Sequence, residues 1–324
     1  MLEVAIEVLN RNAEISIFLE SIGYKTEKTE NISYDILLEN NSKQQFKKTI
    51  NLEKLSYSDP YWLQTEGSLG MYNVNKRTLI GKPETPRKAV VFFNLLIGTT
   101  QLTIKKNIIH RYSKRDQGEL YDPFEIVPLV TTKLNDKVLL FSDANEQTVN
   151  VGVRSGTNNI KGKLFLDVPE KWKVSPTFIE IEIKQKGDTQ TYPFKITPTI
   201  NDSEGVIKAS VLVDGKKFDK ELIEIKYDHI PKQTVLKKSE AKAVRLNIKK
   251  AGNFIGYIKG AGDLVPESLK QIGYSVVMIN PEEITTEHLK KYDAIVLGIR
   301  AYNTIPILKY KQKFLLEYVK NGGN

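Results

Sequence analysis

The residues that most often carry out hydrolysis are few and widely separated in this sequence. Its three histidines are His110, His229 and His288, and it contains no cysteine. A catalytic zinc ion needs several His, Cys or carboxylate ligands that converge, and a thiol nucleophile needs cysteine. The absence of cysteine also excludes disulfides and thiolate metal sites within these residues. We therefore expect no catalytic residue, no metal ligand and no cofactor-binding residue in this chain, and a structural role for His110.

Aromatic residues gather at one place, where Tyr57, Tyr61 and Trp62 surround Pro60. Flat aromatic faces can stack on sugar rings, and the same side chains can also fasten a long loop to a hydrophobic core. Both interpretations stay open for Tyr61 and Trp62, which form the candidate glycan contact. Trp172 stands apart from this cluster, and we expect it to pack in a core or a loop.

Two loops near the end of the chain form a second candidate site. The first contains Gly260, Gly262 and Asp263, and the second contains Arg300 and Asn303. Each follows a strand of an expected parallel sheet, and ligands bind at the carboxyl edge of such sheets. As a dinucleotide motif the first loop is weak, because Val265 replaces the third glycine of G-x-G-x-x-G. The alternatives are a ligand site and a packing role, in which Asp263 caps the following helix and pairs with Arg300.

The elements that would position these residues change in kind along the chain. From residue 2 to about residue 235, apolar and polar residues alternate over short runs that end at Gly, Asn, Asp or Pro. This period of two is typical of strands that bury one face in antiparallel sheets packed as sandwiches. Asp214-Gly215 predicts a hairpin turn, and Gly187-Asp188 is a weaker candidate for another.

From residue 253 onward, continuous apolar runs alternate with helical patterns. The runs at residues 254–258, 275–279 and 294–299 predict buried parallel strands, and helices are expected at 264–272, 285–292 and 305–320. The predicted fold class is therefore multidomain, with two antiparallel β-sandwiches followed by a flavodoxin-like α/β domain. Three strands are few for such a sheet, so we expect this last domain to be truncated.

The predicted domain boundaries follow from these changes. Residues 1–118 form a first sandwich with a long irregular insert at 51–87, and residues 119–235 form a second, immunoglobulin-like sandwich. A basic linker is expected at residues 236–252, followed by the incomplete α/β domain at 253–324. The 40% share of hydrophobic residues in 324 is enough for two or three separate cores.

The net charge of +9 raises the question of a polyanionic partner. Most lysines alternate with acidic residues along strand-like segments, as solvated sheet faces do. The dense basic stretch lies in the expected linker, so we favour a solvated connector, with a polyanion site as the alternative, and expect no nucleic acid partner. No apolar run reaches the roughly 20 residues of a membrane-crossing helix.

Several segments taken in order resemble a known protein region. They are Pro-Tyr-Trp-Leu at 60–63, Gly-Glu-Leu-Tyr-Asp-Pro-Phe-Glu-Ile-Val-Pro at 118–128, and the loops at 255–263 and 292–303. This series is similar to the region downstream of the catalytic domain in long bacterial PIG-L family (LmbE-like) deacetylases of the Bacteroidetes type. The resemblance spans most of the chain, and its motifs are specific through their order.

The resemblance implies a parent protein that removes acetyl groups from N-acetylated sugars with zinc. In that family a hydrolase domain precedes β-sandwich modules and a domain like class I glutamine amidotransferases or ThuA-like proteins. The His-Pro-Asp-Asp zinc motif has no counterpart here, and no amidotransferase Cys-His-Glu set can be assigned. The partner implied is thus an N-terminal deacetylase domain that would hold the zinc, with a periplasmic or extracellular location if that part carried an export signal.

The leading hypothesis is a non-catalytic accessory portion of such a deacetylase, which supports the hydrolase or contacts glycan. The alternative is a free-standing carbohydrate-binding or adhesive β-sandwich module. An amidotransferase-like enzyme built on the last domain is the third possibility, and the missing nucleophile counts against it.

Overall fold

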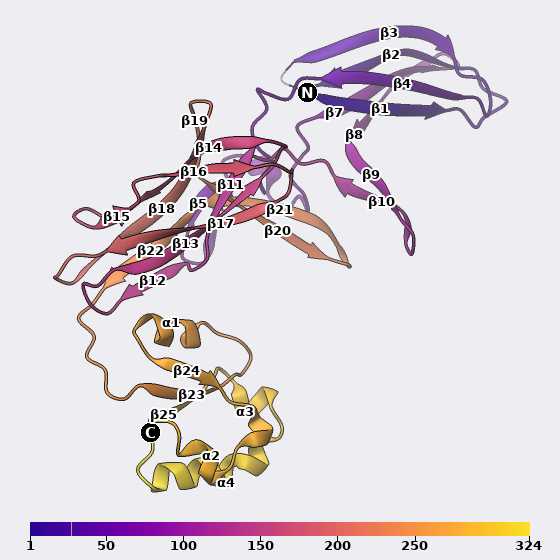
Figure 1. Ribbon diagram of the computed structural model, residues 1–324. Helices are drawn as coiled ribbons and strands as arrows, with labels where there is room; N and C mark the ends of the chain where they lie inside the picture. Colours follow the sequence, from indigo (N-terminus) through magenta and orange to yellow (C-terminus); the bar gives the residue numbers. More distant parts are fainter. Residues whose placement is uncertain (27) are drawn as a thin grey trace. The chain divides into compact units, whose positions relative to one another are not determined.

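The computed structural model describes residues 1–26 and 28–324 of the chain (Figure 1). Strands arranged in several sheets dominate it, and helices are few. The chain divides into two compact units, Met1–Leu129 with Glu221–Lys237, and Val130–Lys220 with Lys238–Asn324. A β-rich multidomain fold is therefore confirmed, whereas the finer assignment of each domain stays a prediction.

The first unit has two sheets around one hydrophobic core. Strand β1 (Leu2–Leu9) pairs antiparallel with β4 (Lys43–Ile50). The second sheet is antiparallel with the order β3 (Thr29–Leu37), β2 (Ile17–Lys25), β7 (Val90–Ile97) and β8 (Thr100–Asn107). The period of two in the sequence explains the core, because β1 buries Val4 and Ile6 while Glu3 and Glu7 stay exposed.

Three further strand pairs belong to this unit. They are β5 (Thr65–Ser68) with β6 (Met71–Asn73), β9 (Ile109–Lys114) with β10 (Gly118–Pro123), and β20 (Lys220–Tyr227) with β21 (Ile230–Lys238). The irregular insert at 51–87 thus contains one hairpin, followed by the short 3-10 helix η1 (Arg77–Leu79).

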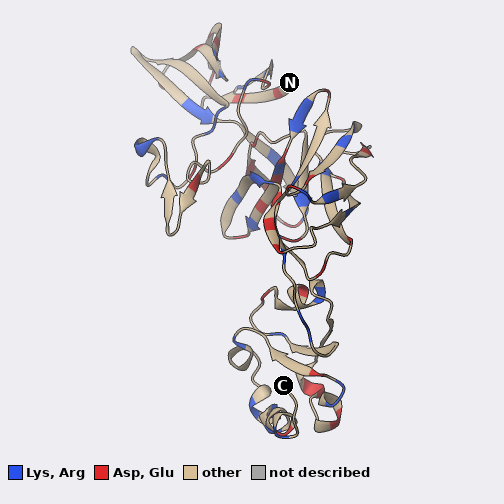
Figure 2. Ribbon diagram, turned by 90° about the vertical axis from the view of Figure 1, so that its left-hand side faces the viewer, with Lys and Arg blue, Asp and Glu red and all other residues tan. Residues whose placement is uncertain are grey.

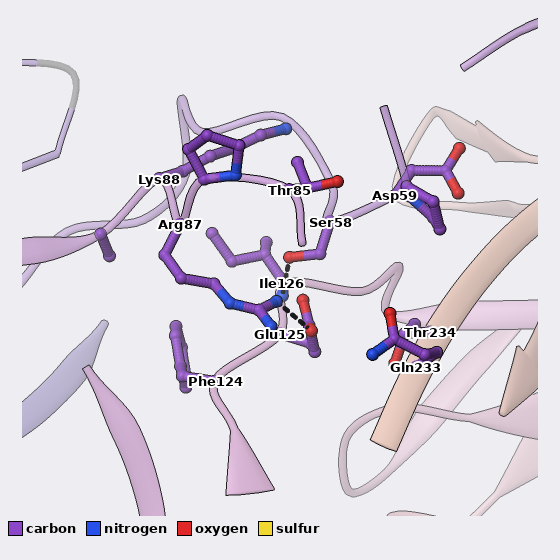
Figure 3. Close-up of a pocket in the computed structure, with 13 residues that line it drawn as sticks. Ser58, Asp59, Thr85, Arg87, Lys88, Phe124, Glu125, Ile126, Gln233 and Thr234 are labelled. Carbon is purple, nitrogen blue, oxygen red and sulfur yellow. Dashed lines mark hydrogen bonds and ion pairs between the residues drawn. The ribbon is translucent and has the colours of Figure 1, made fainter. Parts of the chain in front are cut away.

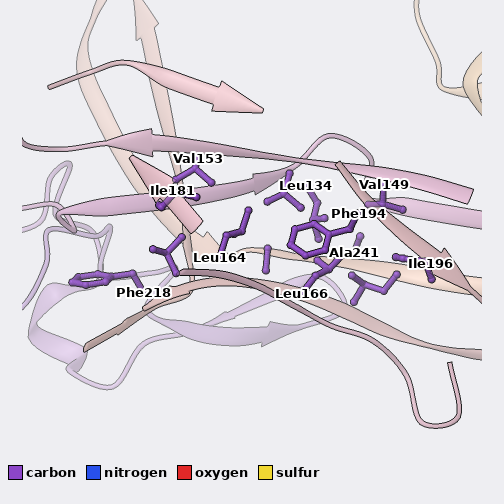
Figure 4. Packing of buried hydrophobic residues seen from close by; sticks show 14 of the residues in the cluster. Leu134, Val149, Val153, Leu164, Leu166, Ile181, Phe194, Ile196, Phe218 and Ala241 are labelled. Carbon is purple, nitrogen blue, oxygen red and sulfur yellow. The ribbon is translucent and has the colours of Figure 1, made fainter. Parts of the chain in front are cut away.

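The second unit begins with two sheets that share the largest core of the chain. One is antiparallel, with the order β11 (Val130–Leu134), β13 (Gln147–Ser155), β17 (Thr189–Thr197) and β15 (Lys173–Ser175). The other has the order β12 (Val138–Phe141), β22 (Glu240–Arg245), β18 (Ser203–Val213), β14 (Ile160–Asp167) and β16 (Ile179–Ile183), with β19 (Lys216–Phe218) beside β18. Side chains of both sheets interdigitate, as Figure 4 shows for Phe194 and Leu166. This arrangement is sandwich-like.

Three local predictions from the sequence differ from this structure. Residues 113–119 do not separate two strand series but belong to the β9–β10 hairpin, with the turn at 115–117, and the contact boundary follows Leu129. The segment at 236–252, expected to be a linker, contains β22, an interior strand of its sheet. Its sequence did not indicate a strand, because the buried residues Ala241 and Ala243 are small and flank Lys242. One strand pair of that sheet, β12 with β22, is parallel.

The turns give one confirmed and one wrong prediction. Asp214 and Gly215 both have positive φ, at 46° and 74°, and join β18 to β19 as the hairpin prediction requires. Gly187 also has positive φ, but the strands on either side of it belong to different sheets. The turn at Gly187 therefore connects sheets and forms no hairpin.

The remaining part of the second unit is a three-stranded parallel sheet with the order β24 (Ser275–Met278), β23 (Phe254–Ile258) and β25 (Ala294–Leu297). Helix α1 (Val265–Gln271) lies on one side of it, and α2 (Thr286–Leu289) and α4 (Leu308–Lys320) lie on the other (Figure 1). The helix expected at 305–320 begins later, because Pro306 separates α3 (Ala301–Thr304) from α4. A short 3-10 helix, η2 (Pro281–Glu283), precedes α2.

Charges on the sheets are mixed in sign. Figure 2 shows lysine and arginine interspersed with acidic residues over the strands. Cross-strand ion pairs follow from this, such as Lys161 with Glu182 at 3.2 Å and Lys242 with Glu204 at 2.8 Å. The two basic residues of β22, Lys242 and Arg245, are thus part of a sheet. Arg245 is buried and donates to the carbonyl of Ile200 at 3.1 Å.

Candidate functional site

The insert of the first unit forms an open apolar groove. Its wall consists of six side chains, Tyr61, Trp62, Met71, Tyr72, Val74 and Ile80, around a volume of about 430 Å³. Small-molecule sites usually have volumes of roughly 300–1,000 Å³ and largely apolar walls. We call this feature the Trp62 groove.

A tight turn after Pro60 fixes one side of the Trp62 groove. The Leu63 N–H donates to the Pro60 carbonyl at 2.9 Å, and the Tyr61 N–H donates to Thr85 Oγ1 at the same distance. The buried Tyr61 ring donates its hydroxyl to the Lys82 carbonyl at 3.1 Å. Its ring meets Trp62 edge to face, with centroids 4.9 Å apart and planes at 89°. Trp62 is thereby held by a buried neighbour and remains partly exposed.

The β5–β6 hairpin and the segment after it form the other side. Gly70 at φ 81° makes the hairpin turn possible, since the left-handed region strains residues with a Cβ. The Asn73 side chain donates to the Glu66 carbonyl at 2.7 Å and ties the two strands together. Met71, Tyr72 and Ile80 remain 63% or more exposed, although they are large and apolar. Exposed apolar side chains gathered on one surface mark sites of interaction.

A polar contact region anchors the insert at its base. Arg87 forms ion pairs with Glu84 at 3.0 Å and with Glu125, and the Arg87 and Glu125 side chains are each only 14% exposed (Figure 3). The Ser58 hydroxyl accepts the Ile126 N–H at 2.9 Å, also drawn in Figure 3. The cavity enclosed here measures about 30 Å³, which is space for about one water molecule. Ser58 and Arg87 therefore join the two ends of the insert to residues 125–126 and leave no room for a ligand larger than water.

Lys88 lies in the same region and extends toward the start of the insert. Its ammonium donates to the carbonyls of Ser56 and Tyr57, at 3.1 and 2.6 Å. Burial lowers the pKa of Lys88, and the nearby carboxylates of Asp59 and Glu125 oppose this shift. Tyr57, grouped with Tyr61 and Trp62 in the sequence, thus serves this anchor through its backbone and lies outside the groove lining.

The second candidate site is a pair of loops that bind each other. Asp263 Oδ1 accepts the Tyr257 hydroxyl at 2.6 Å and the Val265 N–H at 3.1 Å, and Oδ2 accepts the Ile299 N–H at 3.1 Å. These bonds lower the pKa of Asp263, mainly through Tyr257. Burial, followed by the bond to this carboxylate, raises the pKa of Tyr257 to about 12.

The glycines of these loops have different roles. A Cβ on Gly260 would lie 2.1 Å from the Ile299 carbonyl oxygen, so the absent side chain lets the two loops touch. Gly262 has φ 113°, a conformation that favours glycine, with open space around it. The close approach at Gly260 serves packing between loops, which favours the packing interpretation over the ligand site.

In the described part of the chain, neither Arg300 nor Asn303 donates a side-chain hydrogen bond to Asp263. Arg300 adopts the left-handed conformation at φ 56° before α3, and Asn303 lies within that helix. In the described residues the carboxylate of Asp263 accepts hydrogen bonds from Tyr257, Val265 and Ile299, and no ion pair joins it to Arg300. Leu264 is the N-cap residue of α1, and Asp263 precedes it.

The other residues considered in the sequence take structural positions. Trp172 is buried against Phe141, with centroids 4.9 Å apart, and donates to Ser203 Oγ at 3.1 Å, which confirms the packing prediction. His110 stacks on Tyr112 at 5.3 Å. Within residues 1–26 and 28–324, no three His, Asp or Glu side chains are grouped as a metal ion would require. Over the same residues, no helix has the length and apolar character of a membrane span.

Comparisons with known proteins add little to this geometry. No protein-family model matches the sequence, and no curated protein matches it. A solved structure of a family 123 glycoside hydrolase from Clostridium perfringens, described for glycolipid glycan hydrolysis, aligns over 52% of this chain and 37% of its own length. Its sequence identity is 8% and the TM-score is 0.22, a value at which the alignment carries no argument. The resemblance to PIG-L deacetylases receives no support from these comparisons and stays a prediction.

Proposed function

We propose that this chain contacts glycan through the Trp62 groove and acts as a non-catalytic accessory portion of a larger sugar-modifying protein. The observation that carries the proposal is the groove itself, an open volume of about 430 Å³ with aromatic and aliphatic walls. One face of a pyranose ring presents C–H bonds, which pack against the electron-rich face of an indole.

The rigidity of the groove favours such binding. Trp62 is supported by Tyr61, whose backbone and hydroxyl are both bonded to the segment at 82–85. A ring that is already held in place loses little conformational freedom when a ligand stacks on it. The polar edges of a sugar can keep their contacts with water, because the groove is open.

The sequence resemblance supports the second half of the proposal. The segments at 60–63, 118–128, 255–263 and 292–303 resemble the accessory region of PIG-L family deacetylases, and by this resemblance the parent reaction would be zinc-dependent removal of acetyl from an N-acetylated sugar. In this proposal the two β-rich portions are sandwich modules, and the part from residue 253 is an amidotransferase-like (ThuA-like) domain. Its partner is a deacetylase domain that supplies the zinc ligands. Stoichiometric zinc binding and deacetylation by these 324 residues alone would refute an accessory role.

A free-standing carbohydrate-binding module is the second candidate function. The same groove favours it, because all six lining residues belong to one unit and need no other protein. The two candidates share the glycan contact and differ in whether a hydrolase domain accompanies it, which sequencing of the DNA on both sides of the reading frame decides.

The glycan contact is tested by affinity gel electrophoresis against a panel of soluble polysaccharides. We expect at least one polysaccharide to retard the wild-type protein, and Trp62→Ala to weaken that retardation about tenfold or more. Tyr227→Ala is the matched control, since Tyr227 is an exposed aromatic of the same unit outside the groove. Equal retardation of wild type and Trp62→Ala, or no retardation by any polysaccharide, would refute the proposal.

A further inference from the structure

We infer that the Trp62 groove selects anionic glycans, meaning chains of uronic acids or sulfated sugars, over neutral ones. This inference rests on the proposed glycan contact and adds the chemical class of the ligand. Its basis is the charge of the segment that forms one side of the groove. Residues 67–83 contain Lys76, Arg77 and Lys82 and no Asp or Glu.

The backbone carbonyls of the three cationic residues accept hydrogen bonds from groove residues or from their neighbours in the sequence. In the turn that contains η1, the Leu79 N–H donates to the Lys76 carbonyl at 2.9 Å and the Ile80 N–H donates to the Arg77 carbonyl at 3.1 Å. Ile80 lines the groove, so Lys76 and Arg77 lie one turn before a wall residue. The carbonyl of Lys82 accepts the hydroxyl of Tyr61, another wall residue.

Some lysines of the sheets pair with carboxylates of neighbouring strands, as Lys161 does with Glu182 at 3.2 Å. Lys76, Arg77 and Lys82 are exposed and form no ion pair with any residue in 1–26 or 28–324. The acidic residues that bracket the segment are Glu66 and Glu84, and Glu84 is engaged by Arg87. The segment at 67–83, which forms one side of the groove, therefore carries a net positive charge.

An anionic sugar matches both parts of this surface at once. Its ring has an apolar face for Trp62, while a carboxylate or sulfate at the ring edge is attracted by the cations of the segment at 67–83. Arginine binds such groups through two parallel hydrogen bonds, and lysine binds them as a point charge. Opposite unit charges attract each other at contact distance even at the dielectric constant of water.

Single-stranded nucleic acid also combines rings with negative charge, but the groove fits it less well. Proteins that bind such strands stack successive bases on successive aromatic faces. Tyr61 is buried and stands edge-on to Trp62, so Trp62 and Tyr72 are the aromatic rings of the groove that remain accessible. The other wall residues are aliphatic, namely Met71, Val74 and Ile80.

The test measures binding of the full chain to polygalacturonate, chondroitin sulfate, a neutral β-glucan, and a single-stranded oligonucleotide by isothermal titration calorimetry. The key variant is Lys76→Gln/Arg77→Gln, with Lys184→Gln/Lys186→Gln as a control of equal charge change at an exposed site in the other unit. Thermal melting of each variant reports whether the fold is retained. We expect at least one anionic glycan to bind about tenfold more tightly than the neutral one, and the key variant to lose about that factor. The control should bind as the wild type does.

The outcomes separate this inference from the proposal on which it rests. Equal affinity for neutral and anionic glycans, or an unchanged affinity in Lys76→Gln/Arg77→Gln, would overturn the anionic preference and leave the glycan contact intact. Binding of the oligonucleotide as tightly as the anionic glycan would also overturn it, since the groove would then be a general polyanion site. Failure of every glycan to bind would remove the proposed function itself.

Discussion

Asp59 and Leu236 are joined by a hydrogen bond although 177 positions separate them. Asp59 Oδ1 accepts the backbone N–H of Leu236 at 3.1 Å. Asp59 belongs to the insert that forms the Trp62 groove, and Leu236 belongs to β21. The hairpin of β20 and β21, which follows a long stretch of the second unit in sequence, is thus fastened to the first unit at the base of the insert.

Removal of this acceptor should loosen the hairpin. Asp59→Ala leaves the partly buried N–H of Leu236 without its partner, and such a loss costs about 1–3 kcal/mol. We expect a lower free energy of unfolding in urea and faster hydrogen exchange at the Leu236 amide. Asp59→Asn keeps an oxygen acceptor and should lose less. Unchanged exchange at Leu236 in Asp59→Ala would show that the bond contributes nothing to hairpin attachment.

Arg87 and Glu125 should be energetically coupled, so that the loss of one partner destabilises the first unit more than the loss of both. Both side chains are 14% exposed, so Arg87→Met leaves a poorly solvated carboxylate on Glu125. Breaking such a pair from one side costs about 3 kcal/mol, and replacement of both partners by apolar residues costs much less. Urea unfolding of Arg87→Met, Glu125→Leu and the double variant measures this coupling. Additive losses in the double variant would contradict a coupled pair.

The pKa values of Asp263 and Asp293 predict acid sensitivity in the α/β part. Hydrogen bonds lower both pKa values below the usual 3.8; Asp293 accepts the N–H groups of Asn253 and Phe254 at 2.6 and 2.8 Å. A depressed folded-state pKa stabilises the fold above the unfolded-state pKa, and this contribution disappears as pH falls through the folded-state value. We therefore expect the protection factors for hydrogen exchange in the loops at 260–263 and 298–301, corrected for the intrinsic rate at each pH, to decrease below about pH 4.

Asp263→Asn should reduce this acid dependence, because the amide cannot titrate. The same loops should then show protection factors that vary less between pH 3 and pH 6. An unaltered acid profile in this variant, or an NMR titration of Asp263 in the wild type near its ordinary pKa, would contradict the assigned role of the carboxylate.

Gly260→Ala tests the contact between the two loops. The new Cβ would lie 2.1 Å from the Ile299 carbonyl oxygen and 2.9 Å from the Ala301 nitrogen, so backbone must move. Such overpacking costs about 1–3 kcal/mol. Gly152→Ala, where the nearest atom lies 3.7 Å from the Cβ, is the matched control and should cost less. Equal melting temperatures for Gly260→Ala and the wild type would refute a packing role for this glycine.

Local sequence patterns predicted much of the secondary structure. The alternation around Val4 and Ile6, the Asp214-Gly215 turn and the apolar run of β23 each depend on neighbours in the sequence, and the structure contains all three elements. The β22 strand was missed because its buried residues are two alanines and an arginine, Ala241, Ala243 and Arg245, within a charged stretch that resembles a solvated linker. The predicted boundary at residue 118 failed because a charged turn looks the same inside a hairpin and between domains.

The groove could be predicted only in part. Tyr61 and Trp62 were found by their aromatic clustering, whereas Met71, Tyr72 and Ile80 gave no pattern, because the contacts that gather them depend on the fold of an irregular segment. The sequence signal that could have indicated them is the presence of several large apolar residues in a stretch rich in glycine and proline, where no regular strand or helix would bury them. The Asp59–Leu236 bond had no signal in the sequence, since nothing local relates residues so far apart.

The most direct test of a glycan contact at Trp62 uses the tryptophan fluorescence of the chain. Trp62 and Trp172 are its two tryptophans, and Trp172 is buried in the core of the second unit. A glycan that stacks on Trp62 should shift or quench the emission of the wild type and of Trp172→Phe with the same saturation curve. Trp62→Phe should show no change. A response that persists in Trp62→Phe, or its absence in Trp172→Phe, would contradict the central claim that this groove binds sugar.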